Sequence, residues 1–319
     1  MGRVSYRNCL VGQSAKAEMV PFRAMSATNE APAAFRHAAG DAGALGLIRE
    51  AIDDIRSRRR LVRYLVVADM RKHGADTLLG NFWWVLDPLL QMLVYWVFVS
   101  ILVTRDIPDY PLFIFAAILP WKWFSASASD ATTSVTSQDR LIKQIQFPKI
   151  VLPVSASVAG VVGFAFGLIP LGMLMLFSIE RISPYLLLIP VIAAVQFVFT
   201  LAFALLVSSV NVFFRDLGNV VRHVLRLWFY LSPGLYSLAI LDEVELLQEL
   251  PWLRTLIEAN PFAILFEAYR AVIYGAPPTG LPTAPDWASL AVLLVGSTVF
   301  LAVAAILFKR LEPNFAKVL

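Results

Sequence analysis

Six long apolar segments separated by polar ones dominate the hydrophobicity pattern of this chain. They cover residues 82–104, 110–136, 150–178, 184–213, 222–241 and 286–308. A helix needs about 20 largely apolar residues to cross the hydrocarbon core of a bilayer. The pattern therefore predicts an all-α integral membrane protein with six transmembrane helices.

The connection between the fifth and sixth segments, residues 242–285, is too long and too patterned for a plain loop. It contains IEANPFAILFEAYRAVIYG, which is apolar but interrupted by Pro261, Glu267 and Arg270. Irregular backbone at membrane depth persists only where it is buried in protein or lines a cavity. We expect re-entrant or interfacial half-helices here. A seventh full span would place the basic C-terminal tail outside, against the distribution of Lys and Arg.

A basic amphipathic helix is predicted over 50–72, just before the first span. Its apolar stripe consists of Leu61, Leu65 and Ala68, with Val62 and Val66 beside it. The rest of its circumference carries the arginines Arg56, Arg59, Arg60 and Arg63. Such a helix lies in the membrane interface. Its arginines serve either as anchors to anionic lipid or as a recruiting surface for an anionic headgroup such as a lipid diphosphate, and both readings stay open.

A second basic segment, QDRLIKQIQFPKIVLP at 138–153, separates the second and third spans. Helical periodicity divides it into two faces. The aliphatic face, expected to rest on the bundle or the bilayer, has Leu141, Ile142 and Ile145. The face expected to point into the cytoplasm has Arg140, Lys143, Gln144 and Phe147. An exposed aromatic among polar residues suits a partner's pocket, and Pro148 then breaks the helix. The alternative is an interfacial loop with a snorkelling basic fringe.

Composition and charge support this organisation. The 319 residues are 58% hydrophobic and 16% charged, whereas soluble domains average about 45–50% apolar and about 25% charged. Lys and Arg concentrate in 49–72, after the second and fourth spans, and in the tail, which predicts that both termini are cytoplasmic. Residues 1–45, rich in Ala, Ser and Gly, are expected to form a disordered cytoplasmic leader that precedes a membrane domain over 46–319.

The sequence shows few of the motifs that are typical of an enzyme active site. The single cysteine, Cys9, excludes an internal disulfide and a cysteine cluster. There is no GxxxxGK[ST] loop to hold ATP phosphates and no GxSxG. The adjacent acids Asp53-Asp54 and Asp242-Glu243 lie outside the spans, on opposite sides. We expect no catalytic residue, metal or cofactor in this chain.

Five stretches in order carry a resemblance to a known family. They are RYLVVADMRKHGADTLLGNFWWVLDPLLQMLVYWVFVS, YPLFIFAAILPWKWFSASASDATTSV, LIKQIQFPKIVLPVSA, NVFFRDLGNVVRHVLRLWFYLSP and ANPFAILFEAYRAVIYG. Over about residues 45–315 the chain resembles the ABC-2 type permeases that export bacterial polysaccharides, the Wzm-like group of O-antigen, capsule and teichoic acid exporters. The leader has no counterpart in that pattern.

The resemblance implies a type V ABC exporter fold and a set of partners. It implies a homodimer of six-span subunits in the bacterial inner membrane, paired with two copies of a separate ATPase that binds ATP and Mg. The segment 139–148 would be the coupling helix seated in a groove of that ATPase, with the amphipathic helix nearby. The cargo would be a polyprenyl-diphosphate-linked polysaccharide such as O-antigen or galactan. No nucleic acid is implied.

Channel residues can also be suggested. Lys122 lies about 12 residues, and so ~18 Å, into the second span. It either contacts cargo or pairs with Glu267 or another acid, and we favour pairing. By resemblance the first, second and fifth spans line the channel, which makes Phe124, Trp228 and Tyr236 candidate sugar contacts, although aromatics at helical spacing more often pack in the core.

Three other functions remain as alternatives. The first is an ABC-2 permease for another lipid or a drug. The second is a secondary transporter, which would normally show inverted repeats and a titratable relay at mid-membrane. The third is a polyprenyl-dependent membrane enzyme, which would need clustered acids for a divalent metal.

Overall fold

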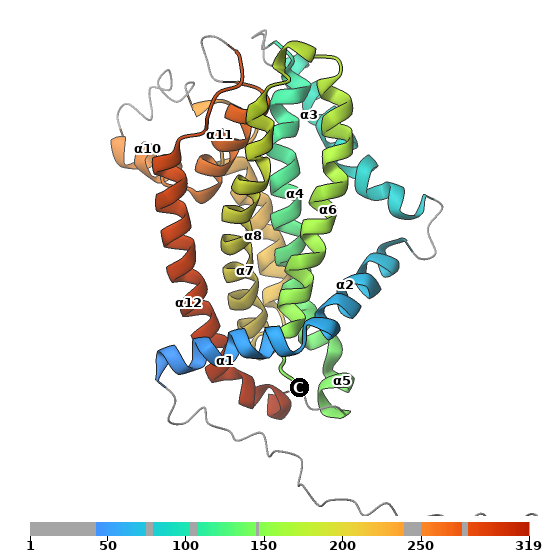
Figure 1. Ribbon diagram of the computed structural model, residues 1–319, viewed down its shortest axis with the longest axis vertical. Helices are drawn as coiled ribbons and strands as arrows, with labels where there is room; N and C mark the ends of the chain where they lie inside the picture. Colours follow the sequence, from blue (N-terminus) through green and yellow to red (C-terminus); the bar gives the residue numbers. More distant parts are fainter. Residues whose placement is uncertain are drawn as a thin grey trace, which may run out of the picture. The chain divides into compact units, whose positions relative to one another are not determined.

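The computed structural model describes residues 43–74, 79–102, 108–144, 147–238, 250–275 and 280–318. Within these ranges all regular secondary structure is helical, and the principal helices run side by side as a bundle (Figure 1). The expected leader lies almost wholly outside the described residues. Of it, only Ala44 and Leu45 belong to a described helix, the first one.

In the part of the chain that the structure describes, five helices are long and apolar enough to cross a membrane. They are α3 (Trp83–Leu102), α4 (Tyr110–Ser134), α6 (Val151–Met175), α7 (Ile189–Phe213) and α12 (Trp287–Val318). Short 3-10 turns occur at Gly80–Phe82, Thr136–Gln138, Ile179–Arg181 and Pro184–Leu188. The prediction of an all-α membrane protein is confirmed.

The predicted fifth span, 222–241, differs from the helix found there. Helix α8 (Leu217–Leu231) begins earlier and ends earlier, with 15 residues. It stops because Ser232 is extended, at φ −89° and ψ 150°, and because Pro233 has no N–H to continue the ladder. In Figure 1 α8 nevertheless runs beside α7 as a member of the bundle.

The last helix is longer than predicted. The apolar segment ends near residue 308, but α12 continues to Val318. This extension is stable because Phe308 and Phe315 are fully buried and their rings pack edge to face, with centroids 5.3 Å apart. Hydropathy therefore located the apolar part of α12 but not its end.

Helix α4 forms the centre of the bundle and is the most buried of the five candidate spans. It approaches α6 closely at two glycines. A Cβ on Gly160 would lie 2.0 Å from Ser127 Oγ, and one on Gly167 would lie 2.1 Å from Leu119 Cδ1. Small residues let helix backbones come together where lipid offers no hydrophobic driving force, so these glycines set the spacing of α4 and α6.

The predicted single amphipathic helix over 50–72 is two helices. Helix α1 (Ala44–Ser57) and α2 (Arg59–Gly74) are separated by Arg58, at φ −102° and ψ 21°. The break has a packing cause, because α1 lies across α12 whereas α2 lies against α6 (Figure 1). Leu47 and Ala51 bury the apolar face of α1, and Val66 that of α2.

Two helices follow the unassigned segment after α8. They are α10 (Pro251–Glu258) and α11 (Pro261–Ile273), and α11 is packed against α4, α7 and α12. The side chain of Asn260 caps α11, because its Oδ1 accepts from Phe262 N–H at 3.0 Å. The 13 residues of α11 are too few for a span, and their burial fits the expectation of a half-helix enclosed by protein.

Arg270 of α11 is the most confined charge in this region, with 2% exposure. Its guanidinium donates to the carbonyls of Pro233 (2.7 Å), Gly234 (2.6 Å) and Tyr236 (3.1 Å), in the turn after α8. It also lies 3.8 Å from the centre of the Phe113 ring and 3.4 Å from Glu267. Arg270 thus supplies hydrogen-bond donors to the carbonyl groups that follow the end of α8.

We expect Arg270→Met to destabilise the protein strongly, because each buried carbonyl left unpaired costs about 1–3 kcal/mol. The matched control is Arg254→Met, which removes an exposed ion pair to Glu258 worth roughly 0–1 kcal/mol. The thermal unfolding midpoint of each purified variant in detergent checks this. Equal midpoints for the two variants would contradict the structural role of Arg270.

Candidate functional site

The segment between α4 and α6 forms a short helix at one end of the bundle. Helix α5 (Asp139–Gln144) lies at the same end as α1 and the C-terminal part of α12 (Figure 1). Ile142 is buried at 6% exposure, whereas Lys143 and Gln144 are exposed. The expected division into a seated face and an offered face therefore holds for these three residues. The side chains of Arg140 and Leu141 lie outside the description.

Phe147 is not exposed, and the prediction that it faces a partner is wrong. It is 9% exposed and belongs to an apolar cluster with Ile142, Phe308 and Phe315. The error arose because α5 ends at Gln144, so a helical projection no longer applies three residues later. Pro148 is buried as well. Phe147 anchors the segment to the bundle.

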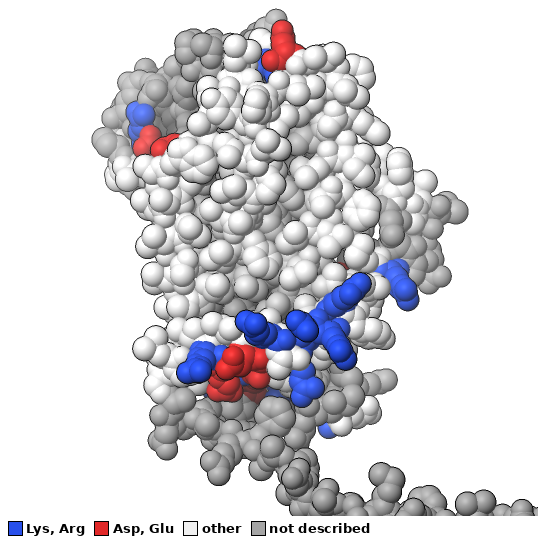
Figure 2. Space-filling model, viewed as in Figure 1, with Lys and Arg blue, Asp and Glu red and all other residues white. Residues whose placement is uncertain are grey.

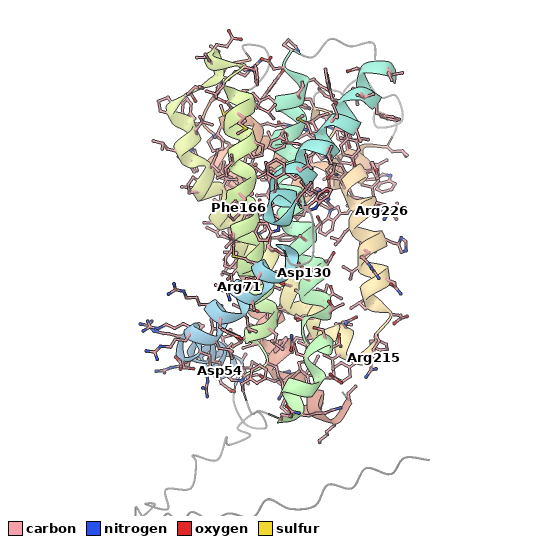
Figure 3. The ribbon with its side chains drawn as sticks, turned by 90° about the vertical axis from the view of Figure 1, so that its right-hand side faces the viewer. Asp54, Arg71, Asp130, Phe166, Arg215 and Arg226 are labelled. Atoms are coloured by element: carbon pink, nitrogen blue, oxygen red, sulfur yellow. The ribbon has the colours of Figure 1, made fainter. Side chains whose placement is uncertain are left out.

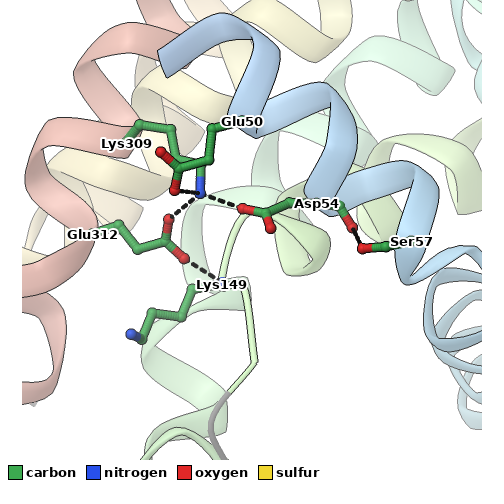
Figure 4. A network of polar contacts seen from close by, with 6 residues as sticks. All are labelled: Glu50, Asp54, Ser57, Lys149, Lys309 and Glu312. Atoms are coloured by element: carbon green, nitrogen blue, oxygen red, sulfur yellow. Dashed lines mark hydrogen bonds and ion pairs between the residues drawn. The ribbon is translucent and has the colours of Figure 1, made fainter. Parts of the chain in front are cut away.

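Beside this cluster lies a polar network centred on Lys309 (Figure 4). Its ammonium, on a side chain that is 4% exposed, pairs with Asp54, with Glu50 at 3.1 Å and with Glu312 at 3.0 Å. The other carboxylate oxygen of Glu312 accepts from the Lys149 backbone N–H at 2.5 Å. The network therefore ties α1, α12 and the segment that follows α5 to one another.

Sequence reasoning missed this network. It treated Lys309 as one of several basic tail residues and Asp54 as part of an isolated acidic pair. The available signals were the i,i+3 spacing of Lys309 and Glu312 and the i,i+4 spacing of Glu50 and Asp54. Both spacings place side chains on one helical face.

The four arginines suggested as a lipid-diphosphate surface are exposed on α1 and α2. They are Arg56, Arg59, Arg60 and Arg63. Figure 2 shows basic side chains in a band along these helices, with acidic ones beside it, while the described residues above it on this face are largely uncharged. The band marks one boundary of the apolar zone. What it binds stays a prediction.

The favoured pairing of Lys122 with an acid is confirmed, and the partner is Asp87 of α3 and not Glu267. Glu267 instead lies beside Arg270. The Lys122 side chain is 29% exposed and borders a cavity of about 350 Å³ between α2, α3, α4 and α6.

The structure does not bring Phe124, Trp228 and Tyr236 to this cavity. Phe124 is fully buried, which contradicts a channel-facing role, and its ring centroid lies 4.6 Å from Phe262 and 5.6 Å from Trp228. The indole N–H of Trp228 donates to Asn260 Oδ1 at 3.0 Å. Tyr236 is partly buried, and its carbonyl accepts from Arg270. These aromatic residues make contacts within the protein, as aromatics at helical spacing more often do.

Arg222 and Arg226 of α8 are exposed at the depth of the apolar bundle. Trp228, two residues further on, lies 5.6 Å from Phe124 and 6.0 Å from Phe203 by ring centroid. Those phenylalanines are the fifteenth of 25 residues in α4 and in α7. Arg226 is thus about 6 Å along the helix axis from mid-bundle.

In Figure 3 Arg226 projects outward from α8. In the described ranges no acidic side chain pairs with Arg222 or Arg226, and Arg222 donates to Asn219 Oδ1 at 2.5 Å. The predicted fifth span, 222–241, included both arginines, yet they were also counted among the basic residues after the fourth span. Because α8 begins at Leu217, they belong to the helix and not to a connection. Their recurrence with Asn219 and Tyr230 at steps of three or four residues was the signal for a polar helical face.

Comparison with known proteins places the chain among permeases. No family model matches it. The chain is 32% identical over 262 residues to the O-antigen export system permease protein RfbA of Myxococcus xanthus, an alignment that covers 81% of this chain and 95% of the relative. Two proteins of the same name from Klebsiella pneumoniae are 25% and 27% identical, each over 79% of this chain and 92% of the relative. Together with the helical membrane fold, this similarity shows that the chain belongs to the family of ABC-2 polysaccharide-export permeases that includes the O-antigen export permeases.

Proposed function

We propose that this chain is the membrane-spanning permease subunit of an ATP-driven exporter in the bacterial inner membrane. Its cargo is an O-antigen or a similar cell-envelope polysaccharide on polyprenyl diphosphate, taken from the cytoplasmic side. The observation that carries the proposal is the 32% identity across 95% of the Myxococcus xanthus permease. Family membership disfavours the secondary-transporter and membrane-enzyme alternatives.

ATP hydrolysis is assigned to a separate ATPase, two copies per exporter, because this sequence has no phosphate-binding loop. The contact with that ATPase is assigned to the exposed side of α5, where Lys143 and Gln144 lie. This places α5, α1 and the C-terminus on the cytoplasmic side, in keeping with the basic band on α1 and α2.

The contacts behind α5 supply a route for force. Ile142 and Phe147 pack in one cluster with Phe308 and Phe315 of α12, and the Lys149 N–H is bonded to Glu312 of the same helix. A displacement of α5 therefore moves α12, and through Lys309 it moves α1. Close-packed interiors transmit strain because they have little room to deform.

We expect Lys143→Glu to weaken association with the ATPase, since it reverses a charge on the offered face of α5. Co-purification of the tagged chain with its ATPase, and ATPase stimulation, check this. Lys317→Glu makes the same change near the end of α12, where Lys317 is exposed, and is expected to have little effect. Full association of Lys143→Glu would remove α5 as the contact.

Phe147→Ala is expected to act differently, because Phe147 is buried. Phe→Ala substitutions in a packed core cost about 3–5 kcal/mol. The unfolding midpoint of the purified chain alone should fall, before any ATPase is added. An unchanged midpoint with lost ATPase binding would instead return Phe147 to the contact surface.

The exposed face of α8 supports a second copy of the chain. Unpaired arginines at membrane depth are unfavourable against lipid and face a bundle interior or a water-filled cavity. In a homodimer whose α8 helices border a common path, Arg222 and Arg226 would be hydrated and available to an anionic cargo. Their mutual repulsion across such a path favours water and anions between them.

Thiol accessibility tests this arrangement in a Cys9→Ser background. We expect Arg226→Cys in membranes to react with a charged, membrane-impermeant methanethiosulfonate, because the thiolate that reacts needs water. Val299→Cys is the control, at a site that is 60% exposed on α12 and expected to face lipid, and should stay unmodified. Protection of Arg226→Cys, or equal labelling of both, would contradict a water-filled path along α8.

A further inference from the structure

The cavity beside Lys122 has walls of a distinctive chemistry. Its volume of about 350 Å³ lies at the lower end of the range for small-molecule sites. Among the described residues, its chemistry-bearing lining includes three tryptophans, three carboxylates and one ammonium. These are Trp83, Trp84, Trp123, Asp69, Asp87, Asp130 and Lys122. None of these side chains was assigned a common site from sequence.

The aromatic walls are held in place by packing. Trp123 is 3% exposed, and its ring lies 4.9 Å from Phe164, while Trp84 meets Phe166 edge to face at 5.5 Å. Gly160 of α6 makes room for the Trp123 ring, because a Cβ on Gly160 would lie 2.8 Å from Trp123 Cδ1. Trp123 supports the wall from behind, whereas Trp83 and Trp84 are more exposed and offer flat apolar surface to a ligand.

The polar groups offer both donors and acceptors. The indole N–H of Trp123 is buried and has no acceptor among the described residues. Lys122 supplies an ammonium, and its pairing with Asp87 crosses from α4 to α3. Carboxylates only accept hydrogen bonds, whereas a hydroxyl donates and accepts. A polyhydroxylated ligand can therefore match every kind of group in this wall.

The charged residues of the lining determine which class of ligand the cavity favours. Among the described lining residues carboxylates outnumber ammonium groups, which favours a neutral ligand over a phosphate or another anion. The described residues include no group of three acidic, His or Cys side chains arranged to hold a metal ion. Figure 3 places Asp130 of α4 level with Arg71, near the end of α2, so the cavity lies inward of the basic band.

We infer that this cavity binds a neutral sugar ring of the cargo. The ring would stack on the indole faces of Trp83 and Trp84, with its hydroxyls bonded to the carboxylates and to the Lys122 ammonium. This inference rests on the proposed function and deepens it. It separates a neutral sugar site on the α2–α3 side from the cationic face of α8.

The inference is tested by placing a larger side chain at an exposed position of the cavity wall. Ala126 lines the cavity and is exposed on α4, so Ala126→Phe occupies its volume, and Ala126→Leu does so more mildly if the larger variant folds poorly. Ala291→Phe is the matched control on an exposed site of α12, outside the cavity. The full-length protein in nanodiscs is examined by saturation-transfer NMR with methyl α-galactoside and methyl α-mannoside, and with glucuronate and inorganic phosphate as anionic probes.

Binding of a neutral glycoside should be detected in the wild type and in Ala291→Phe and be weakened about tenfold in the filled variants. No neutral binding in the wild type, equal binding in the filled variants, or stronger binding of the anions would overturn the inference. Export of O-antigen in cells that lack their own permease is scored in parallel. If the wild-type chain exports O-antigen but the filled variants still bind sugar, the sugar site is refuted and the proposed function is not. If the wild-type chain fails to export O-antigen, the proposed function is refuted.

Discussion

A charged side chain inside an apolar bundle must find its partners within the protein, and this constraint organises both ends of the structure. Among the described residues three basic side chains are buried: Arg181, Arg270 and Lys309. At one end, Arg181 pairs with Asp109 at 2.8 Å, donates to the carbonyls of Tyr274 and Gly280, and lies 4.2 Å from the centre of the Tyr274 ring. Breaking such a buried pair is costly because it leaves an uncompensated charge. Each cation therefore fixes segments that are distant in sequence.

At the other end the same constraint connects the proposed ATPase contact to the bundle. Lys309 requires acidic groups, and α1 supplies two of them. Glu312, held by Lys309, in turn bonds the backbone just after α5. The helix that would receive force from the ATPase is thus joined to α12 by a polar network on one side and by the Phe147 cluster on the other. If α5 were attached only through a flexible loop, the loop would absorb its displacement and α12 would not move.

Hydropathy was sufficient to predict the class of fold and the position of most spans, because lipid imposes length and apolarity on any crossing helix. It was insufficient where a residue's neighbour comes from another helix. Phe147 was assigned to an exposed face because a helical projection was extended beyond Gln144, where α5 ends. Arg226 was counted among the basic residues that follow the fourth span, although the predicted fifth span included it, because basic residues usually mark the cytoplasmic side. In both cases the deciding fact was a helix boundary, which local composition specifies weakly.

The contrast between the buried and the exposed cations gives a physical criterion for function. Arg181, Arg270 and Lys309 are buried and already bonded to carbonyls and carboxylates of the protein, so they are not exposed to a cargo. Arg222 and Arg226 lie at membrane depth without an acidic partner in the described ranges, and stability of the single chain gives no reason to keep them there. Lys122 falls between these cases, since it is paired with Asp87 yet borders a cavity. Whether a basic side chain is already bonded within the protein, more than its depth in the membrane, separates the cations that stabilise this fold from those that are available to a cargo.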